Sequence, residues 1–161
     1  MARKKTTGDK TNVMRILDTA GVPYTAHAYK ADPAMSGSEI AQLMGEDTAK
    51  VFKTLVTRGR SGEYYVFVVP VNANLDLKKA AKAAGEKSIA MILQKELLPL
   101  TGYVHGGCSP IGMKKQYQAF VHEAATELDR IYVSAGKVGM QIELSPEDLA
   151  RIAELTPADL I

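Results

Sequence analysis

Apolar residues recur at helical spacing in several short segments of the chain. The first stripe lies in residues 11–20 and is followed by Gly21, which suits a helix C-cap. Ser36 and Glu39 have the spacing of a capping box, and they predict a second helix that stops at Gly45. The same periodicity predicts helices over 76–85, over 93–98 with Pro99 as its stop, and from Ser145 onwards.

Runs of β-branched and aromatic residues alternate with these helices. Residues 50–57 and 64–71 are two such runs separated by a short polar segment, which predicts a hairpin. The second run is apolar throughout, as in a central strand that is covered on both faces. Further strands are predicted near 22–29, 88–92, 117–122, 130–134 and 140–144. The pattern therefore predicts an α/β fold: one domain with a mixed β-sheet.

Composition narrows the class of protein. At 161 residues the chain has the length of one domain, and 46% hydrophobic with 24% charged residues argues against a disordered or fibrous protein. Residues 1–10 are polar and predict a flexible arm, so the domain is expected over 11–161. The net charge of +2 permits a nucleic-acid partner without indicating one.

Several classes of site are excluded by what the sequence lacks. Its single cysteine rules out a disulfide framework and a site with several thiolate ligands. The three histidines are far apart and lack metal-ligand spacing, so we expect structural histidines and no metal. No apolar run approaches the ~20 residues of a membrane span. The first residues, MARKKTTGDK, do not have the pattern of a signal peptide, and we expect a cytoplasmic protein.

Residues 102–115, GYVHGGCSPIGMKK, form a loop with four glycines and one proline. Bare amide groups beside lysines suit a site that holds a carbonyl oxygen or a phosphate, but glycine and proline also cluster in purely structural turns. Both interpretations remain open on this stretch alone. Cys108 lies in the loop with His105 close by in sequence, but nothing in the sequence shows that the two meet, so we do not expect a catalytic cysteine.

Lys53 interrupts an otherwise apolar predicted strand, on the face shared by Val51 and Leu55. An unpaired ammonium is costly to bury. Lys53 therefore either extends into solvent at a sheet edge or points into a cavity that receives an anion. The pattern alone slightly favours the edge.

Four motifs taken together, in this order, carry a family resemblance: VFKTLV at 51–56, LDLKKAAKAAG at 75–85, TGYVHGGCSPIG at 101–112 and IYVSAGKVGMQIEL at 131–144. They resemble the YbaK family of aminoacyl-tRNA deacylases, which is related to the editing domain inserted in bacterial prolyl-tRNA synthetases. The resemblance covers nearly the whole chain. It implies a mixed, strongly curved β-sheet flanked by helices, and trans-editing of mischarged Cys-tRNA(Pro) without a cofactor or metal. It also implies tRNA(Pro) and prolyl-tRNA synthetase as partners.

The resemblance also implies the site residues. Lys53 and Thr54 belong to the substrate pocket, with Lys53 meeting the 3′ end of the tRNA, and Gly106 opens a loop whose backbone holds the ester. Residues implied in substrate binding are Tyr29, Gly107, Ser109, Gly112, Ser134, Gly136 and Gln141. The thiol of the substrate itself is implied as the attacking group, which leaves Cys108 as a bystander.

Two departures from the family pattern bear on the substrate. Gln141 stands where many relatives have an aspartate, and the segment between Asp32 and Glu39 is shorter, with Ser38 near an expected aromatic. Alternative functions are therefore deacylation of Ala-tRNA(Pro) or of another small aminoacyl-tRNA. A non-catalytic module that binds aminoacyl-tRNA or a synthetase is the alternative from another class.

Overall fold

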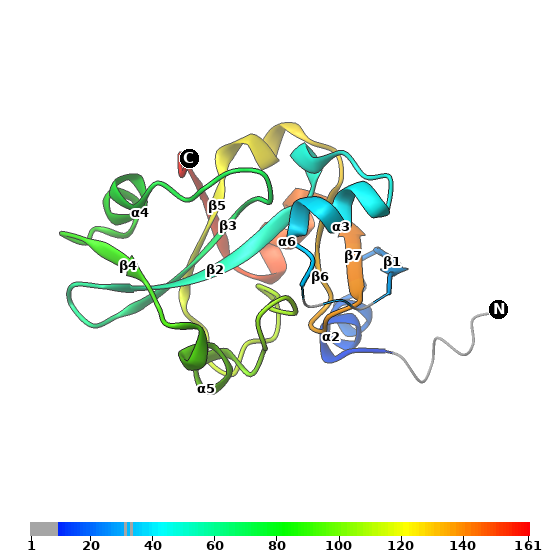
Figure 1. Cartoon of the computed structure of the whole chain (residues 1–161), viewed down its shortest axis with the longest axis horizontal. Helices are drawn as coiled ribbons and strands as arrows, with labels where there is room; N and C mark the ends of the chain where they lie inside the picture. The colour runs from blue at the N-terminus through cyan, green and yellow to red at the C-terminus, as the bar shows by residue number, and fades with distance from the viewer. Residues whose placement is uncertain (1–9, 31, 33) are drawn as a thin grey trace.

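The structure is a computed structural model that describes residues 10–30, 32 and 34–161 (Figure 1). The N-terminal arm predicted over 1–10 lies, apart from Lys10, outside these residues. No helix in the described part of the chain has the length and apolar character needed to cross a membrane.

The capping box at Ser36 and the C-cap at Gly21 are confirmed. The capping box is present at the start of α3, where the Glu39 N–H donates to Ser36 Oγ at 3.1 Å and the Ser36 N–H donates to Glu39 Oε1 at 2.8 Å. Gly21 ends α2 in the left-handed region at φ 72°. The helices are α2 (Asn12–Ala20), α3 (Gly37–Leu43), α4 (Leu77–Ala84), α5 (Leu97–Thr101) and α6 (Pro146–Ile152), with short 3₁₀ turns at Thr48–Lys50, Gln94–Glu96 and Glu123–Glu127.

The prediction that Pro99 stops a helix is wrong. Pro99 lies inside α5, which continues to Thr101 and ends at Gly102 with φ 86°. Proline is tolerated there because it occupies the first helical turn, where the missing N–H has no intrahelical acceptor to lose.

The described strands form two sheets. One has five strands in the order β4 (Ile89–Met91), β2 (Phe52–Gly59), β3 (Tyr64–Pro70), β5 (Gln118–His122) and β8 (Leu155–Ala158). The other has three antiparallel strands in the order β1 (Thr25–Ala28), β7 (Met140–Leu144) and β6 (Ile131–Ser134). The larger sheet is mixed, since β3, β5 and β8 are parallel. The α/β class with mixed pairing is confirmed, and the one sheet expected is divided in two, joined by an isolated bridge between Val51 and Tyr132.

Strand β8 was not predicted from the sequence. It contains Pro157, which lacks the N–H of a ladder and argues against a strand, but proline is tolerated at a sheet edge. β8 is an edge strand, parallel to β5. The segment after it is fixed by His122, whose Nδ1 accepts a hydrogen bond from the Leu160 N–H at 3.2 Å. His122 is thus a structural histidine, as predicted.

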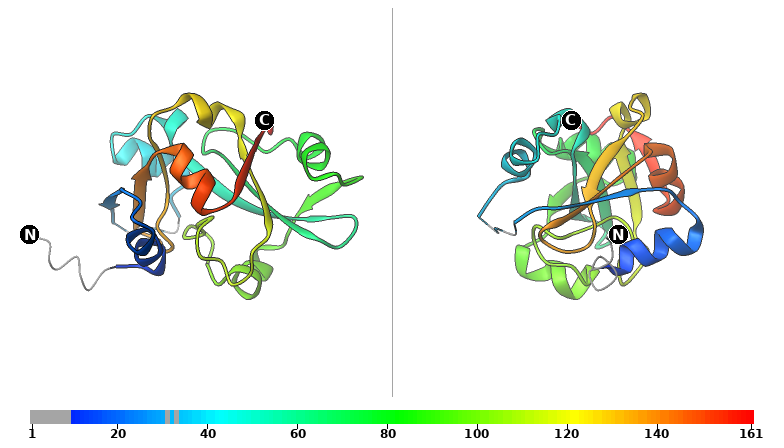
Figure 2. Two further views of the ribbon diagram at one scale, coloured as in Figure 1. Left: turned by 180° about the vertical axis from the view of Figure 1, so that it is seen from behind. Right: turned by 90° about the vertical axis from the view of Figure 1, so that its right-hand side faces the viewer.

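The central position predicted for 64–71 is confirmed, because β3 is buried on both faces. Val66 and Val68 belong to one core cluster, and Phe67 and Val69 belong to another. The first cluster includes residues from both sheets together with Leu17 of α2 and Leu149 of α6. α4 packs against the second cluster, and α4 and α2 lie towards opposite ends of the molecule (Figure 2). One shared core therefore holds the two sheets together.

We expect Leu17→Ala to lower the free energy of unfolding by about 2–5 kcal/mol, because Leu17 is fully buried and its loss leaves a cavity between α2 and the sheets. Urea unfolding of the purified variant measures the change. Thr19→Ala on the exposed face of the same helix is the control and should alter stability by less than about 0.5 kcal/mol. Equal effects of the two substitutions would contradict the packing described for α2.

Candidate functional site

A cavity of about 230 Å³ lies where the two sheets separate. The bridge between Val51 and Tyr132 joins the residue just before β2 to β6, and β4 pairs with β2 from Thr57 onwards. From Phe52 to Leu55 the ladders pair β2 on one side only, with β3, and the first hydrogen bond on the β4 side runs from the Ile92 N–H to Val56 O at 3.4 Å. Lys53 and Thr54 of β2 and Ser134 of β6 line the space, which we call the inter-sheet cavity.

The remaining walls of the inter-sheet cavity come from segments far apart in the chain. The glycine-rich loop contributes one wall, the start of α3 another, and α5 an apolar side chain. Together with residues of β2 and β6, the lining includes Tyr29, Met35, Ser36, Gly37, Ile40, Leu97, His105, Gly106, Cys108, Val133 and Gln141. The result is a mostly apolar enclosure with a few polar groups, which is the usual character of a ligand site.

The structure brings together six of the ten residues that the sequence analysis placed in the site. They are Lys53, Thr54, Gly106, Tyr29, Ser134 and Gln141, and all line the inter-sheet cavity. Gly107, Ser109, Gly112 and Gly136 are not part of its lining.

These four residues lie behind the lining and support the segments that form it. A Cβ on Gly107 would lie 3.0 Å from the backbone N of Val138, which is tighter than most Cβ contacts, so glycine lets the loop pack closely against the β6–β7 turn. The Ser109 side chain is fully buried, and its Oγ accepts from the Ile111 N–H at 3.3 Å. Gly112 and Gly136 have φ of 77° and 101°, and both lie against Tyr103.

Lys53 is half-buried and lies in the lining of the inter-sheet cavity. Burial lowers the pKa of its ammonium group, and no carboxylate pairs with it among the described residues. Lys53 lies both on the unpaired stretch of β2 and in the cavity lining, so its position combines the two alternatives open in the sequence. An anionic ligand would supply the opposite charge that the protein does not.

Two buried polar atoms in the lining have no hydrogen-bond partner among the described residues: Thr54 Oγ1 and Gln141 Oε1. Buried polar atoms in folded proteins are nearly always paired, so each such exception calls for an explanation. Ser134 differs, because its Oγ already accepts from the Gly136 N–H at 3.1 Å. A ligand with hydrogen-bond donors would satisfy both unpaired atoms.

The glycine-rich loop presents a backbone donor at a fixed position. Gly106 has φ 87°, in the left-handed region that favours glycine. The Gly107 N–H donates to Val104 O at 3.0 Å, whereas within the described residues no acceptor takes the Gly106 N–H. The Tyr117 hydroxyl donates to Leu100 O at 2.7 Å and the Tyr103 hydroxyl donates to Ile111 O, so both ends of the loop are held. A fixed, unused N–H is suited to a developing oxyanion.

Cys108 is not an activated nucleophile. Burial raises the pKa of its thiol to about 12, so the thiolate is scarce at neutral pH. His27 contacts Glu143 at 2.8 Å and His122 fixes the C-terminal segment, so neither is available to activate it. No group of three metal-binding side chains converges anywhere in the described part of the chain.

Several lining residues were missed by the sequence analysis. His105 was read as a structural histidine, and Met35, Ile40 and Leu97 were not distinguished from ordinary apolar positions. For the three apolar residues no local pattern could have separated them, because they meet only through tertiary packing. His105 had one signal, its place in the glycine-rich loop beside Gly106.

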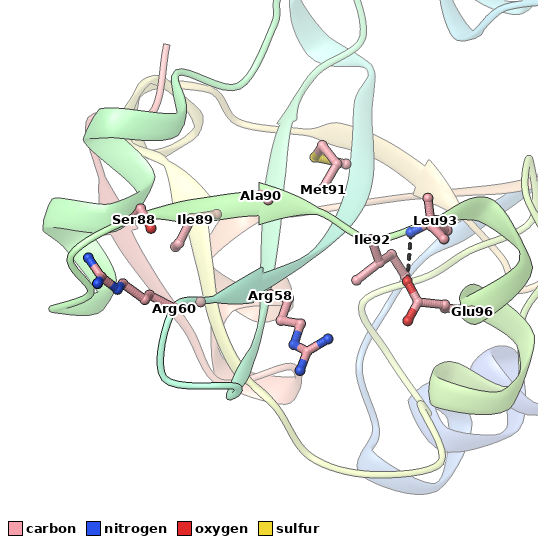
Figure 3. A pocket seen from close by; sticks show the side chains of 10 residues that line it. Arg58, Arg60, Ser88, Ile89, Ala90, Met91, Ile92, Leu93 and Glu96 are labelled. Carbon is pink, nitrogen blue, oxygen red and sulfur yellow. Dashed lines mark hydrogen bonds between the residues drawn. The ribbon is translucent and has the colours of Figure 1, made fainter.

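A second, larger hollow of about 410 Å³ lies beside β4. Figure 3 shows Arg58 and Arg60 on its border, with their guanidinium groups pointing away from one another. Both arginines are exposed, and Glu96 is already engaged, since its Oε1 accepts from the Leu93 N–H at 2.8 Å. This β4 hollow has volume but no buried polar groups that lack partners among the described residues. The smaller inter-sheet cavity is therefore the candidate site.

Comparison with known proteins agrees with the resemblance seen in the sequence. The family model of the aminoacyl-tRNA editing domain matches residues 31–152. A protein of Enterococcus faecalis, EbsC, named as a candidate Cys-tRNA(Pro)/Cys-tRNA(Cys) deacylase, is 45% identical over 97% of this chain and 98% of its own. The proline–tRNA ligase of Thermosipho melanesiensis is 32% identical over 47% of this chain and 13% of its own.

A solved structure shares the fold. It is the crystal structure of a candidate trans-editing enzyme for prolyl-tRNA synthetase, with a TM-score of 0.80 and 25% identity, covering 93% of this chain and 97% of that one. The matches extend over both sheets and over the segments that line the inter-sheet cavity. The chain belongs to the aminoacyl-tRNA editing family, the YbaK family of deacylases that its sequence resembles.

Proposed function

We propose that this protein, as an aminoacyl-tRNA deacylase of the editing family, hydrolyses the ester of cysteine mischarged on tRNA(Pro). The observation that carries the proposal is the convergence of Lys53, Thr54, Gly106 and Gln141 on one small cavity. The 45% identical relative is named for cysteinyl-tRNA substrates, and the similarity covers nearly both chains. A binding module would not require the fixed backbone donor and the half-buried lysine in the same cavity.

The size of the inter-sheet cavity suits a small amino acid. At about 230 Å³ it lies below the ~300–1,000 Å³ of pockets that enclose drug-sized ligands. The amino-acid part of the substrate enters this cavity, and the terminal adenosine stays towards its mouth. Lys53 meets negative charge at the 3′ end of the tRNA, which offsets the desolvation of its ammonium group.

The chemistry needs no protein nucleophile, because an aminoacyl ester is already activated. The sulfur of the substrate attacks its own carbonyl carbon, the bond to the ribose oxygen breaks, and the thiol proton ends on that oxygen. The released cyclic thioester then takes up water to give cysteine. The Gly106 N–H stabilises the oxyanion while Thr54 and Gln141 hold the amino acid in place, so the enzyme acts by positioning and electrostatics.

Prolyl-tRNA synthetase is the expected partner. Prolyl-tRNA synthetase discriminates poorly between cysteine and proline because the two amino acids are similar in size. A second site then hydrolyses the wrong product. The net charge of +2 provides little attraction for free tRNA, so the synthetase would supply tRNA selection. Deacylation of the mischarged tRNA is expected in the cytoplasm.

Lys53→Met tests the role of the cavity lysine. The variant keeps the aliphatic length and removes the ammonium group, so we expect the single-turnover rate on Cys-tRNA(Pro) to fall at least about 100-fold. Stability should stay equal or rise, because burial disfavours the charged form in the folded state.

Lys78→Ala on the exposed face of α4 is the matched control and should keep the rate of the unmodified protein. Full activity of Lys53→Met would overturn the site. Release of no amino acid by the unmodified protein, with tight binding of the aminoacyl-tRNA, would instead support the non-catalytic module. Release of alanine from Ala-tRNA(Pro), with no release of cysteine from Cys-tRNA(Pro), would support the same site with a different substrate.

Cys108→Ala is expected to leave the deacylation rate within about twofold, since a buried thiol with its pKa raised to about 12 takes no part in the reaction. Single-turnover kinetics on Cys-tRNA(Pro) measures the effect, and thermal unfolding reports any loss of packing. A drop of two orders of magnitude in a folded variant would show that Cys108, and not the substrate thiol, is the nucleophile.

Arg58 and Arg60 border the β4 hollow and are expected to contact tRNA phosphates outside the inter-sheet cavity. Replacing both with alanine should raise KM for the aminoacyl-tRNA with kcat nearly unchanged. The dependence of log KM on log salt should become shallower by about one unit for each phosphate that the variant no longer binds. Lys82→Ala on α4, which lines neither hollow, is the control. A fall in kcat with an unchanged KM would show that these arginines act in the chemical step and not in tRNA binding, which would contradict the prediction.

A further inference from the structure

The glycine-rich loop places a histidine at the mouth of the inter-sheet cavity. His105 belongs to the cavity lining and is at the same time exposed to solvent. The other two histidines have engaged rings: His27 contacts Glu143 at 2.8 Å, and Nδ1 of His122 accepts from the Leu160 N–H at 3.2 Å. In the described part of the chain no such contact holds the ring of His105, which is therefore available to a ligand.

The backbone at His105 is a tight turn. The Gly107 N–H donates to Val104 O at 3.0 Å, which closes a β-turn with His105 and Gly106 at its centre. Gly106 has φ 87° and the φ of His105 is not positive, as in a type II turn. The turn rests on the connection between β6 and β7, because a Cβ on Gly107 would lie 3.0 Å from the backbone N of Val138. The ring of His105 is thus carried by a fixed stretch of backbone.

The same turn carries the backbone donor of the proposed oxyanion site. The Gly106 N–H is part of the peptide bond that joins His105 to Gly106, and no acceptor among the described residues takes it. In an ester the carbonyl oxygen and the ribose oxygen are bonded to one carbon atom. A substrate whose carbonyl oxygen lies at the Gly106 N–H therefore has its ribose oxygen beside His105, at the mouth where the adenosine stays.

The cavity lining contains four titratable side chains: Tyr29, Lys53, His105 and Cys108. Proton transfer near neutral pH is served best by a group that exchanges protons there, and imidazole is the side chain with that property. Burial raises the pKa of the Cys108 thiol to about 12, and a phenol is ordinarily a weak acid with a pKa of about 10. The ammonium group of Lys53 is assigned to the negative charge of the tRNA. His105 is the remaining group.

We propose that His105 is a catalytic residue, which carries the proton from the thiol of the substrate to its ribose oxygen. The neutral ring accepts the thiol proton while the sulfur forms its bond to the carbonyl carbon. The imidazolium then donates this proton to the ribose oxygen as the carbon–oxygen bond breaks, and the ring returns to its neutral form. The attacking sulfur and the leaving oxygen are bonded to the same carbon, so one imidazole within about 3 Å of both can serve the two transfers. The inference rests on the proposed function, because it assumes that a cysteinyl ester reacts in this cavity.

His105→Ala tests the proton transfer in single-turnover deacylation of Cys-tRNA(Pro) by the full chain. General acid–base catalysis contributes about 10²–10⁴-fold, so we expect the rate to fall at least about 100-fold. His105→Gln should be similarly slow, because an amide forms hydrogen bonds but does not exchange a proton in this way. Val104→Ala, at the exposed position before the histidine and outside the cavity lining, is the matched control and should keep the rate of the unmodified protein.

Binding is measured separately, by calorimetry with 3′-cysteinylamino-adenosine, in which an amide replaces the hydrolysable ester. The affinity of His105→Ala for this ligand should stay within about threefold of that of the unmodified protein, since the ring acts on the proton and not on the ground state. A loss of affinity as large as the loss of rate would assign His105 to binding and overturn the inference.

Added imidazole distinguishes proton transfer from a structural role. It should raise the rate of His105→Ala at least about tenfold and leave that of Lys53→Met unchanged, because a free base replaces only a missing base. An undiminished rate in His105→Ala or His105→Gln, or a loss that imidazole does not restore, would overturn the inference. Failure of the proposed function is a separate outcome, in which the unmodified protein itself releases no cysteine from Cys-tRNA(Pro).

Discussion

The site depends on a strand that is paired on one side only. From Phe52 to Leu55, between the bridge at Val51 and the hydrogen bond from Ile92 to Val56, the outer edge of β2 faces the inter-sheet cavity instead of another strand. An open edge is normally a liability, and proteins cover it with a loop or a helix. Here the glycine-rich loop and the start of α3 cover it, and they enclose the cavity in doing so. The shared core beneath keeps the two sheets at this fixed separation.

The polar groups on the two sides of the enclosure differ. Lys53 lies on the β2 side, while Gln141, whose Oε1 is buried without a partner among the described residues, lies on the side of the three-stranded sheet. An aminoacyl ester at the end of a tRNA has the complementary arrangement, with phosphates beyond the ribose and an ammonium group on the amino acid. Hydrolysis of such an activated ester needs orientation and an oxyanion donor more than a strong nucleophile. That requirement explains why a buried, protonated Cys108 is compatible with an enzyme.

Local signals predicted what depends on local structure. The caps of α2, α3, α4 and α6, the hairpin of β2 and β3, and the conspicuous lysine at position 53 all follow from neighbouring residues. The division into two sheets could not be predicted, because the bridge at Tyr132 joins segments about eighty positions apart in the chain. Strand β8 was not predicted because Pro157 argues against a strand. The prediction for Pro99 was wrong because its tolerance depends on where the helix begins, and Pro99 lies in the first turn.

The most direct test of the editing site is to locate the aminoacyl end of the substrate on the protein. A crystal structure with 3′-cysteinylamino-adenosine, supported by amide chemical-shift changes in solution, would do so. We expect the cysteinyl group between β2 and β6, with its carbonyl oxygen at the Gly106 N–H and its ammonium group at Gln141. Binding in the β4 hollow bordered by Arg58, with the inter-sheet cavity unchanged, would contradict this placement.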